Sequence, residues 1–392
     1  MSNSTHKVNV VRIEEILPHP NADRLGIVYI GGYQCVVQKD SYKVGDLAIY
    51  IQPDTIVPEI KQFDFLWTGH KEFMATGIVP ARTRRITVRK FRGQWSEGLL
   101  MPISEFIFDR LHSVLYNGRE ATVIVEDTDV AELLGFTHYE EPEEKQDTRQ
   151  QSKQHKGKSK SIRGWFWYLV SFFYKRPTYG EDQTKPPKIM APIYDVESFK
   201  NYGYIFDSPE EDVIVTEKLH GFNARYQFDG EKMHVGSHNY WKSEKSTCVW
   251  RRTLQGNPWI EEFCRQYPGH TLYGEIVPGF KGFNYGVGDD KPRLFAFDVL
   301  RPDGSYIDKR DLFGMDPLTV GQHLVPLLNG HCHKFDRDTI LGMVEGPSTV
   351  PGAKHIREGI VVSSAVERRV RGIGRAQLKL KSMAFLEKAG KV

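Results

Sequence analysis

The sequence predicts an α+β protein in which a small all-β barrel precedes a larger domain of mostly antiparallel sheet. Two observations carry this prediction. In the first third of the chain, short apolar runs alternate with turns rich in glycine, proline and aspartate, which is typical of small barrels. In the second half, apolar runs follow one another with few helical patterns between them. At 392 residues, the chain is long enough for two domains with separate cores.

The composition is that of a soluble globular protein, with 40% apolar and 26% charged residues. A net charge of +3 says little about partners. The first seven residues lack the features of a signal peptide. The four cysteines (Cys35, Cys248, Cys264 and Cys332) show no disulfide or metal-binding spacing. We therefore expect a cytoplasmic protein without stable membrane insertion.

Residues 1–125 are predicted to form the all-β module. Residues 27–30 and 33–37 flank Gly31-Gly32 and predict a hairpin, and further strands are expected at 47–51 and 98–101. Short strands at this spacing favour an oligonucleotide-binding (OB) fold. The segment 18–25, followed by Gly45-Asp46, also resembles tRNA-binding OB modules.

The segment 82–92 is strongly basic, with six arginines and lysines. We expect a strand from Arg84 to residue 90, on which Arg84, Arg85, Arg89 and Arg92 follow nucleic-acid phosphates. Phe91 would stack on bases. The alternative is an ordinary solvated strand face.

Residues 126–188 are predicted to be a linker or insert, because an acidic stretch is followed by a polar, lysine-rich one. Within it lies the aromatic run 165–174, whose ten residues are too few to span a bilayer. This run either packs on a domain or lies against a membrane surface or a partner.

Residues 189–392 are predicted to form the second domain. A buried strand at 213–215, the turn Leu219-His-Gly221 and a second run at 224–228 predict a hairpin with Lys218 at its mouth. A helix is expected at 258–266, with Asn257 as its cap and Gly269 at its end. Later strands are expected at 271–277, 293–299, 358–362 and 377–381.

Lys218 is a candidate nucleophile. A lysine with its ordinary pKa of about 10.4 is protonated and inert, but burial, a neighbouring cation or a metal can free the amine. Gly221 would let a ligand approach the backbone closely. The alternative is an ordinary lysine at a strand end.

Strand alternation places other candidates on shared faces. Lys379 and Lys381 share one face, and two like charges there favour an anion such as phosphate between them. Tyr273 and Glu275 share a face, as do Phe295 and Phe297. The sequence contains no phosphate-binding P-loop and no Rossmann glycine fingerprint, so a nucleotide would need this other arrangement.

Five segments in order resemble motifs I, III, IIIa, IV and V of the covalent nucleotidyltransferases, the superfamily of ATP-dependent ligases and mRNA capping enzymes. They are Lys218-Leu-His-Gly221, Tyr273-Gly-Glu275, Phe295-Ala-Phe-Asp298, Glu358-Gly-Ile-Val361 and Lys379-Leu-Lys381. His220, where DNA ligases have aspartate, resembles the nick-sealing RNA ligase branch.

With the barrel included, the chain resembles the Deinococcus-type RNA ligase family. That family couples an N-terminal OB domain to an antiparallel-sheet-rich nucleotidyltransferase domain, an ATP-grasp-like ligase core. The resemblance covers residues 6–125 and 189–392. One departure is His238, which stands where an arginine is expected.

The resemblance implies an ATP-dependent RNA ligase that seals nicks between a 3′-OH and a 5′-phosphate through lysyl-AMP and an adenylylated 5′ end, in RNA repair. It implies ATP as substrate, Mg²⁺ or Mn²⁺, and a nicked duplex with RNA on the 3′-OH side. By this resemblance, Lys218 is the nucleophile and Glu358 and Asn223 bind the metal. Glu217 contacts adenine through its backbone, Phe297 stacks on adenine and Glu275 binds the ribose. Lys379 and Lys381 bind the α-phosphate, and His220 contacts the phosphates. For His220, a hydrogen bond within the turn is the alternative.

Other functions remain open at this point. A DNA ligase or capping enzyme would normally carry an OB domain after motif V, and only 11 residues follow Lys381. A non-catalytic tRNA-binding protein would rest on residues 8–51 alone and leave the second domain unexplained. A structural protein recruited through the aromatic run is a third alternative. The sequence names no physiological RNA, protein partner or oligomeric state.

Overall fold

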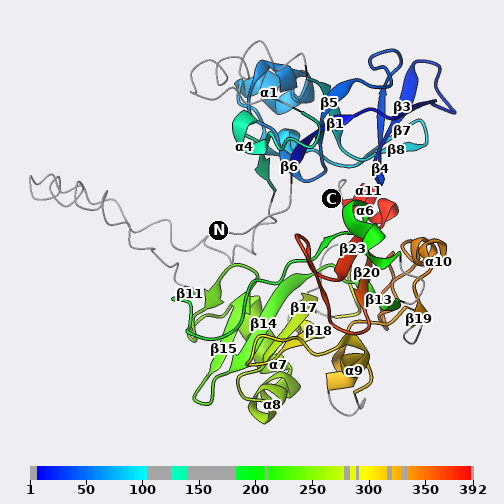
Figure 1. Cartoon of the computed structure of the whole chain (residues 1–392). Helices are drawn as coiled ribbons and strands as arrows, with labels where there is room; N and C mark the ends of the chain where they lie inside the picture. Colours follow the sequence, from blue (N-terminus) through cyan, green and yellow to red (C-terminus); the bar gives the residue numbers. More distant parts are fainter. Residues whose placement is uncertain are drawn as a thin grey trace, which may run out of the picture. The chain divides into compact units, whose positions relative to one another are not determined.

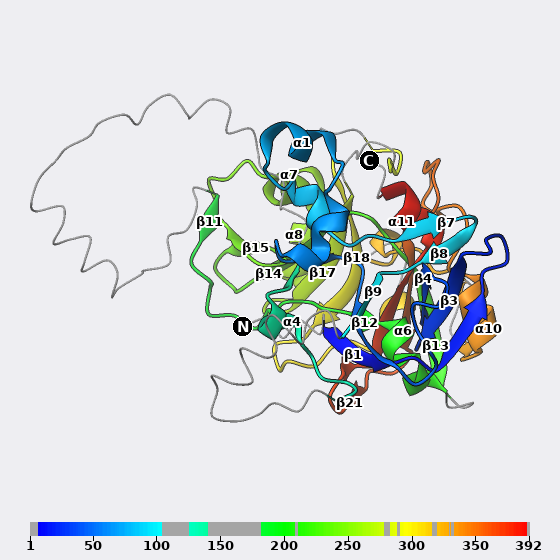
Figure 2. The ribbon, with the colours of Figure 1, turned by 90° about the horizontal axis from the view of Figure 1, so that it is seen from above.

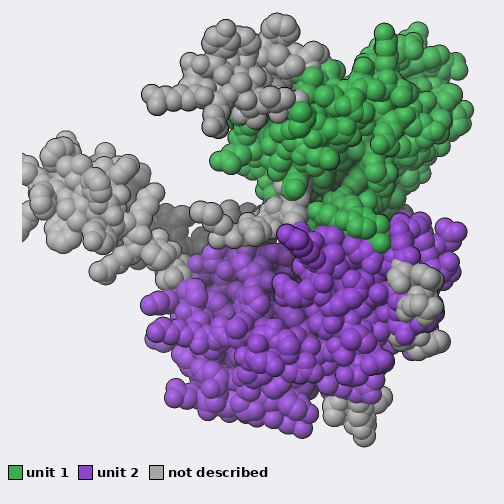
Figure 3. Space-filling view, in the orientation of Figure 1, with its two compact units in different colours: residues 1–141, 197–204, 378–392 green, residues 142–196, 205–377 purple. Residues whose placement is uncertain are grey.

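The computed structural model describes residues 7–103, 125–139, 182–207, 211–277, 283–287, 291–315, 320–328, 330 and 333–389. These residues form two compact units, which Figure 3 colours green and purple. The first unit takes its described residues from within 7–139, 197–204 and 378–389, and the second from within 182–196 and 205–377. The aromatic run 165–174 lies outside the described residues. Among the described helices, none is long and apolar enough to cross a membrane.

The first unit is built from short strands, as the sequence predicts (Figure 1). One sheet has the order β1-β5-β9 and a second the order β2-β3-β4, while β6 pairs with β10, and β7 with β8. Its elements are β1 (Val8–Arg12), β2 (Glu15–Pro18), β3 (Leu25–Ile30), β4 (Tyr33–Gln38), β5 (Leu47–Ile51), β6 (Thr55–Ile56), η1 (Lys61–Leu66), α1 (Lys71–Thr76), η2 (Ala81–Arg84), β7 (Arg89–Phe91), β8 (Gln94–Ser96), β9 (Leu99–Pro102), α4 (Ala131–Leu134), β10 (Thr137–His138), β12 (Glu197–Ser198), α6 (Phe199–Tyr202) and α11 (Met383–Ala389).

The sheet β1-β5-β9 is buried on both faces because each face packs into its own core. On β5, Ile49 and Ile51 point into a cluster with Phe63 and Val130. The alternate residues Ala48 and Tyr50 point into a second cluster, with Val28 and Cys35 of the sheet β2-β3-β4. The period-two alternation of β5 thus joins two apolar layers.

The expected hairpin of β3 and β4 is confirmed, with Ile30 opposite Tyr33. Gly31 has a φ of +53°, which suits the turn. Gly32 is needed for a different reason, since a Cβ there would lie 2.9 Å from the backbone oxygen of Lys200 on α6. The segment 197–204 is therefore held close to the barrel, where Lys200 also forms an ion pair with Glu97.

The expected strand from 84 to 90 is wrong in its first part. Residues 81–84 form the 3-10 helix η2, and strand β7 begins only at Arg89. Arg84 donates to the backbone oxygen of Val57, and Arg85 donates twice to Asp54. The backbone of residues 84–86 also pairs with residues 54–57, through a bridge between Arg85 and Ile56. This pairing does not extend to Arg89, where β7 pairs with β8 instead.

The second unit contains two sheets. The larger has the order β11-β16-β15-β14-β17-β18, and the smaller places β13 between β20 and β19. Neighbouring strands are antiparallel, which confirms the predicted antiparallel-rich α+β class. Its elements are β11 (Gln183–Thr184), β13 (Asp212–Lys218), β14 (Phe222–Phe228), β15 (Met233–Ser237), β16 (Trp241–Lys242), α7 (Val249–Gly256), α8 (Pro258–Gln266), β17 (Thr271–Val277), β18 (Arg293–Leu300), α9 (Lys309–Phe313), η6 (Val320–His323), β19 (His333–Lys334), α10 (Arg337–Gly342), β20 (Gly359–Ser364), β21 (Arg369–Val370) and β22 (Gly374–Arg375). Two elements, η5 (Gly203–Phe206) and β23 (Gln377–Lys381), contribute residues to both units.

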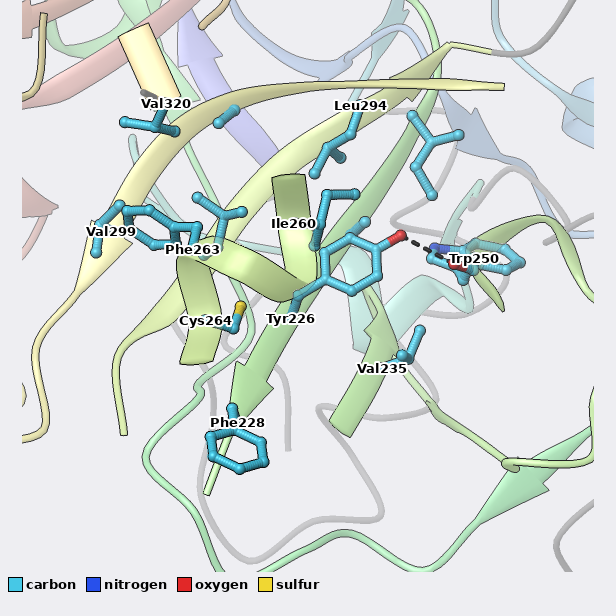
Figure 4. Close-up of a cluster of buried hydrophobic side chains, with 14 of the residues drawn as sticks. Tyr226, Phe228, Val235, Trp250, Ile260, Phe263, Cys264, Leu294, Val299 and Val320 are labelled. Carbon is cyan, nitrogen blue, oxygen red and sulfur yellow. Dashed lines mark hydrogen bonds between the residues drawn. The ribbon is translucent and has the colours of Figure 1, made fainter. Parts of the chain in front are cut away.

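Helices α7 and α8 cover one face of the larger sheet, and Figures 1 and 2 agree on this placement. The core between them is centred on Tyr226, whose ring is fully buried and whose hydroxyl donates to the backbone oxygen of Trp250 at 3.0 Å (Figure 4). Ile260 and Cys264 of α8 pack into the same cluster. The opposite face carries Asn223 and Glu275 together with a second apolar cluster that includes Val277 and Phe295.

The bounds predicted for α8 are confirmed, but the prediction of Asn257 as a side-chain cap is wrong. Asn257 Nδ2 instead donates to the backbone oxygens of Thr253 and Pro292, at 2.8 and 3.0 Å. Its side chain joins α7 to the start of β18. The helix ends at Gln266, before the predicted Gly269.

The predicted hairpin around Lys218 is also wrong. β13 pairs with β20 and β19, whereas β14 pairs with β15 and β17. The turn 219–221 therefore carries the chain from one sheet to the other. Gly221 sits at this crossing because a Cβ there would lie only 2.1 Å from the backbone oxygen of Ile276. Close approach of two chain segments, rather than of a ligand, is what requires glycine here.

Strand β18 contains a β-bulge at Phe297. Tyr273 of β17 pairs with Asp298, but the next residue, Gly274, pairs with Ala296, so Phe297 has no opposite residue. Bulges re-aim side chains and are frequent beside active sites. Here the bulge brings Phe297 and Asp298 to the same face of the sheet, where both approach Tyr194.

Candidate active site

Lys218 lies at the end of β13, paired in register with Gly359. Glu358, the residue before Gly359, is therefore placed next to it, and Lys218 Nζ lies 2.7 Å from Glu358 Oε1. The lysine side chain is 23% exposed and the glutamate only 5%. A nucleophile candidate thus reaches solvent beside a buried carboxylate.

Glu217 points to the other side of β13 and is 1% exposed. Its Oε2 accepts two hydrogen bonds from Thr349, from the backbone nitrogen and from the hydroxyl, both at 2.7 Å. Its own backbone N–H donates to the oxygen of Pro326 at 2.9 Å. These bonds fix the strand that presents Lys218, and they leave the N–H of Glu217 already occupied.

The face of the larger sheet opposite α7 and α8 brings two polar candidates together. Asn223 of β14 is paired in register with Glu275 of β17, and Glu275 in turn with Phe295 of β18. Both polar side chains are half-buried. Glu275 also approaches the turn 219–221. Its Cγ lies 3.0 Å from the position that a Cβ on Gly221 would occupy. The residues predicted for ribose and metal thus flank the loop that follows Lys218.

Tyr285 is a central residue of this region. Its hydroxyl accepts a hydrogen bond from the backbone N–H of His220 at 2.8 Å, and the side chain is fully buried. Burial raises the pKa of Tyr285 far above its ordinary value; the bond from His220 opposes this, and the charges of Glu358, Glu217 and Glu275 add to it. Tyr285 therefore remains a neutral phenol among three glutamates.

Phe297 is supported by a buried polar network on the same face. Its ring centroid lies 4.8 Å from that of Tyr194, and its backbone oxygen accepts a hydrogen bond from Lys309 Nζ at 2.6 Å. Because Phe297 lies in the bulge, this bond holds a carbonyl at the point where the ladder is interrupted.

Asp298 is the centre of that network and is fully buried. Its Oδ2 accepts bonds from Lys309 at 2.7 Å, Arg375 at 2.6 Å and the hydroxyl of Tyr194 at 2.5 Å. Arg375 also binds both carboxylate oxygens of Glu367, so two anions balance two cations. Burial opposes ionisation of Asp298, but the charges of Lys309 and Arg375 outweigh it and lower its pKa.

Residues 211–381 match the profile of the RNA ligase family, and residues 7–103 match a profile described as an OB-fold domain. These two matches support an RNA ligase domain that follows an OB domain. The fold agrees with this arrangement along almost the whole chain. A search of curated proteins finds no match.

Solved structures of an RNA ligase from Naegleria gruberi share the fold. A lysine-to-alanine mutant with ATP and Mn is 20% identical, with a TM-score of 0.69 over 97% of this chain and 98% of that one. A glutamate-to-alanine mutant with AMP and Mn is also 20% identical, with a TM-score of 0.66 over 97% and 98%. The ligase with PPi is 20% identical, with a TM-score of 0.66 over 99% of both chains. The predicted combination of an OB barrel and a sheet-rich ligase core is confirmed.

Lys379 and Lys381 lie on β23, within the first unit. The predicted alternation holds, because both lysines are half-buried while Leu378 and Leu380 are buried. Lys381 Nζ lies 3.6 Å from Asp54. The anion beside it in this structure is thus a carboxylate of the barrel.

The four arginines predicted to bind nucleic acid fall into two pairs. Arg84 forms an ion pair with Glu59 at 2.6 Å, and Arg85 with Asp54 at 2.6 Å, while Arg85 also stacks on Tyr139. Arg89 and Arg92 are exposed. His238, where an arginine was expected, lies with its Nε2 3.5 Å from Asp195.

Sequence reasoning missed several residues of this candidate site. Tyr285 and Thr349 lie in segments rich in turn residues and outside the recognised motifs, and Tyr194 precedes the first of those motifs. Asp298 belongs to a recognised segment, but its role depends on Lys309 and Arg375, which sequence spacing does not connect to it.

Proposed function

We propose that this protein is an ATP-dependent RNA ligase that uses Lys218 as its nucleophile. It joins a 3′-OH to a 5′-phosphate at nicks in RNA, as a repair activity. The observation that carries the proposal is Lys218 at the end of β13, beside Glu358, in the segment that matches the RNA ligase family. The Naegleria ligase structures with ATP, AMP and PPi support it, since these are the substrate and parts of the products of an adenylyl transfer.

In the first step, the neutral amine of Lys218 attacks the α-phosphorus of ATP. A phosphorus–nitrogen bond forms, the bond to the bridging oxygen of pyrophosphate breaks, and the lysine loses its proton. A carboxylate 2.7 Å away favours the ammonium form of a lysine, so the pairing with Glu358 keeps the amine unreactive until substrate is in place. The covalent intermediate replaces one difficult displacement with easier ones.

The residues near Lys218 suit a hard divalent cation. Glu358 supplies a buried carboxylate, and the amide of Asn223 supplies a second oxygen. No three acidic, histidine or cysteine side chains within the described ranges are close enough to hold a metal by themselves. This fits Mg²⁺ or Mn²⁺, which is commonly held by one or two protein oxygens together with phosphates and water. When bound, the cation would offset phosphate charge.

The nucleoside is assigned to the face of the larger sheet opposite α7 and α8. Phe297 stacks on adenine, Glu275 binds the ribose, and Glu217 contacts adenine through its backbone carbonyl, because its N–H is already bonded to Pro326. His220 contacts the phosphates. Lys379 and Lys381 neutralise charge developing on the α-phosphate, where electrostatic stabilisation is most effective.

Two further transfers complete the reaction. The terminal 5′-phosphate of the RNA attacks the phosphorus of lysyl-AMP, which breaks the phosphorus–nitrogen bond and returns the amine. The 3′-OH then attacks the activated 5′-phosphate and releases AMP. Specificity for RNA on the 3′-OH side follows from a site that hydrogen-bonds the 2′-OH.

Transfer of label from α-labelled ATP to the denatured chain, in the presence of Mg²⁺, tests the first step. We expect the wild type to become labelled, and Lys218→Ala and Lys218→Arg to remain unlabelled, because arginine stays protonated. Lys232→Arg, at an exposed lysine of the same unit, is the matched control and should label normally. Labelling of either Lys218 variant would refute the assignment.

A further inference from the structure

We infer that the hairpin of β7 and β8 binds the phosphodiester backbone of RNA, and that His19 and Asn21 hold this hairpin in position. The inference rests on the proposed ligase function and names the part of the barrel that takes up the substrate. The hairpin comprises Arg89–Phe91 and Gln94–Ser96, with Arg92 and Gly93 between the strands. It belongs to the first unit.

Positive charge at the end of this hairpin is available for a ligand. Arg89, Lys90 and Arg92 are exposed, and none forms a salt bridge with another described residue. Phe91 is 41% exposed among them. Arg84 and Arg85, in the same basic stretch, already bind carboxylates. Lys90 Nζ lies over the ring of Trp95, 4.6 Å from its centroid. The structure thus separates two arginines paired with carboxylates of the barrel from Arg89 and Arg92, which are exposed.

The turn itself has an unusual residue. Arg92 has a φ of +45° and Gly93 a φ of +93°, so both central residues are left-handed, as in a type I′ turn. Asparagine and glycine are the usual residues at the first of these positions, and arginine is strained there. A strained conformation is evidence for a functional role when the side chain is exposed and makes no stabilising contact that explains it.

The segment 18–25 fixes this turn from the side. His19 is 6% exposed; its Nδ1 accepts a hydrogen bond from the backbone N–H of Asn21 at 3.1 Å, so its Nε2 carries the proton and donates to the oxygen of Phe91 at 3.0 Å. Asn21 Nδ2 donates to the oxygen of Arg92, also at 3.0 Å. Both carbonyls at the tip of the hairpin are therefore held.

The other strand of the hairpin is fixed to β4. Gln34 Nε2 donates to the oxygen of Trp95 at 2.6 Å, and the hydroxyl of Ser96 accepts from the backbone N–H of Val36 at 3.0 Å. A preorganised arm loses little conformational freedom when it binds. Each guanidinium group of the hairpin can donate two hydrogen bonds to the oxygens of one phosphate. Phe91 offers a ring face on which a base can stack.

Binding of a fluorescent nicked RNA duplex to the full chain over a range of salt concentrations tests the inference. Arg89→Ala with Arg92→Ala should weaken binding and lower the slope of log affinity against log salt by about two, since each phosphate contact contributes roughly 0.9. Lys61→Ala with Lys71→Ala removes the same charge from η1 and α1 and should leave the slope unchanged. The inference would be overturned if both double variants lowered the affinity and the salt slope equally. It would also be overturned if the double arginine variant bound the duplex as the wild type does.

Two single substitutions separate the RNA contact from folding. Arg92→Asn creates the preferred Asn-Gly turn, so the unfolding temperature should stay the same or rise while RNA affinity falls. Asn21→Ala keeps every cation but removes the hydrogen bond to the backbone oxygen of Arg92, and it should also weaken RNA binding. Wild-type affinity for Arg92→Asn contradicts a phosphate contact, and wild-type affinity for Asn21→Ala contradicts the positioning role. Label transfer from ATP to the wild-type chain is measured in parallel: its absence refutes the proposed ligase and leaves the binding comparison valid.

Discussion

Lys309→Met should destabilise the second unit strongly and loosen the support of Phe297. Lys309 is 3% exposed, and its ammonium makes two short bonds, to the backbone oxygen of Phe297 and to Asp298. Methionine has a similar unbranched length but no charge and no donor. The substitution therefore removes both bonds with little change in packing.

The expected loss can be bounded from the network. Breaking a buried ion pair by removing one partner costs about 3–5 kcal/mol when the other charge is left alone. Asp298 still has Arg375 and Tyr194, so its charge stays partly compensated. The carbonyl of Phe297, however, loses the donor beside the bulge. We therefore expect a loss near the lower limit, about 3 kcal/mol of unfolding free energy.

Denaturant unfolding of the full chain measures this loss, with Lys334→Met as the control. Lys334 pairs with Asp212 at 3.2 Å, but its side chain is 55% exposed, so its removal should cost no more than about 1 kcal/mol. In the label-transfer assay, Lys309→Met should raise KM for ATP more than it lowers kcat. Its effect should be non-additive with Phe297→Ala, because both act on one stacking surface. Equal destabilisation by the two lysine variants, or additive effects on KM, would refute the reasoning.

Three other predictions concern Tyr285, Asp54 and the sugar at the 3′-OH end of the nick. Tyr285→Phe removes the acceptor of the His220 N–H, and should slow AMP transfer in single-turnover assays, whereas Tyr267→Phe at an exposed tyrosine should not; equal rates would exclude Tyr285 from positioning the turn. Asp54→Asn should lower stability by about 1–3 kcal/mol at pH 7. Burial opposes ionisation of Asp54, but the charges of Lys381 and Arg85 outweigh it and lower the pKa of Asp54 in the folded protein. The ionised carboxylate therefore contributes its full stabilisation above the ordinary carboxyl pKa of about 3.9. This stabilisation is lost as the pH falls through the lowered pKa of the folded protein. The gap between variant and wild type should therefore close in acid, and a gap independent of pH would contradict this. Nicks ending in ribonucleotides at the 3′-OH should seal much faster than all-DNA nicks, and equal rates would indicate a DNA ligase.

Local signals predicted much of the fold. The hairpin of β3 and β4, strand β5 and the bounds of α8 follow from glycine turns, apolar runs and a proline at the first helical position. These features depend on residues that are neighbours in the chain. Strand pairing does not, and so the hairpin predicted at Lys218 was wrong: β13 pairs with β20, more than 140 residues later.

The candidate site was predictable to the extent that its residues are neighbours in recognised motifs. Lys218 and Glu358 were each identified, but their contact depends on the register of β13 and β20. The Asp298 network draws on Tyr194, Lys309 and Arg375, three distant segments that converge only through the bulge and the packing around it. A basic run also does not reveal which of its charges have carboxylate partners, as Arg84 and Arg85 do.

The change of sheet at residues 219–221 explains where Lys218, the proposed nucleophile, lies. In a hairpin, Lys218 and Asn223 would belong to one sheet, and the lysine would lie at its edge. Instead, β13 and β20 supply Lys218 and Glu358, while β14, β17 and β18 supply Asn223, Glu275 and Phe297. The chain can make this crossing only because Gly221 leaves room for the oxygen of Ile276. Gly221 thereby lets strands of two sheets contribute residues to the candidate site.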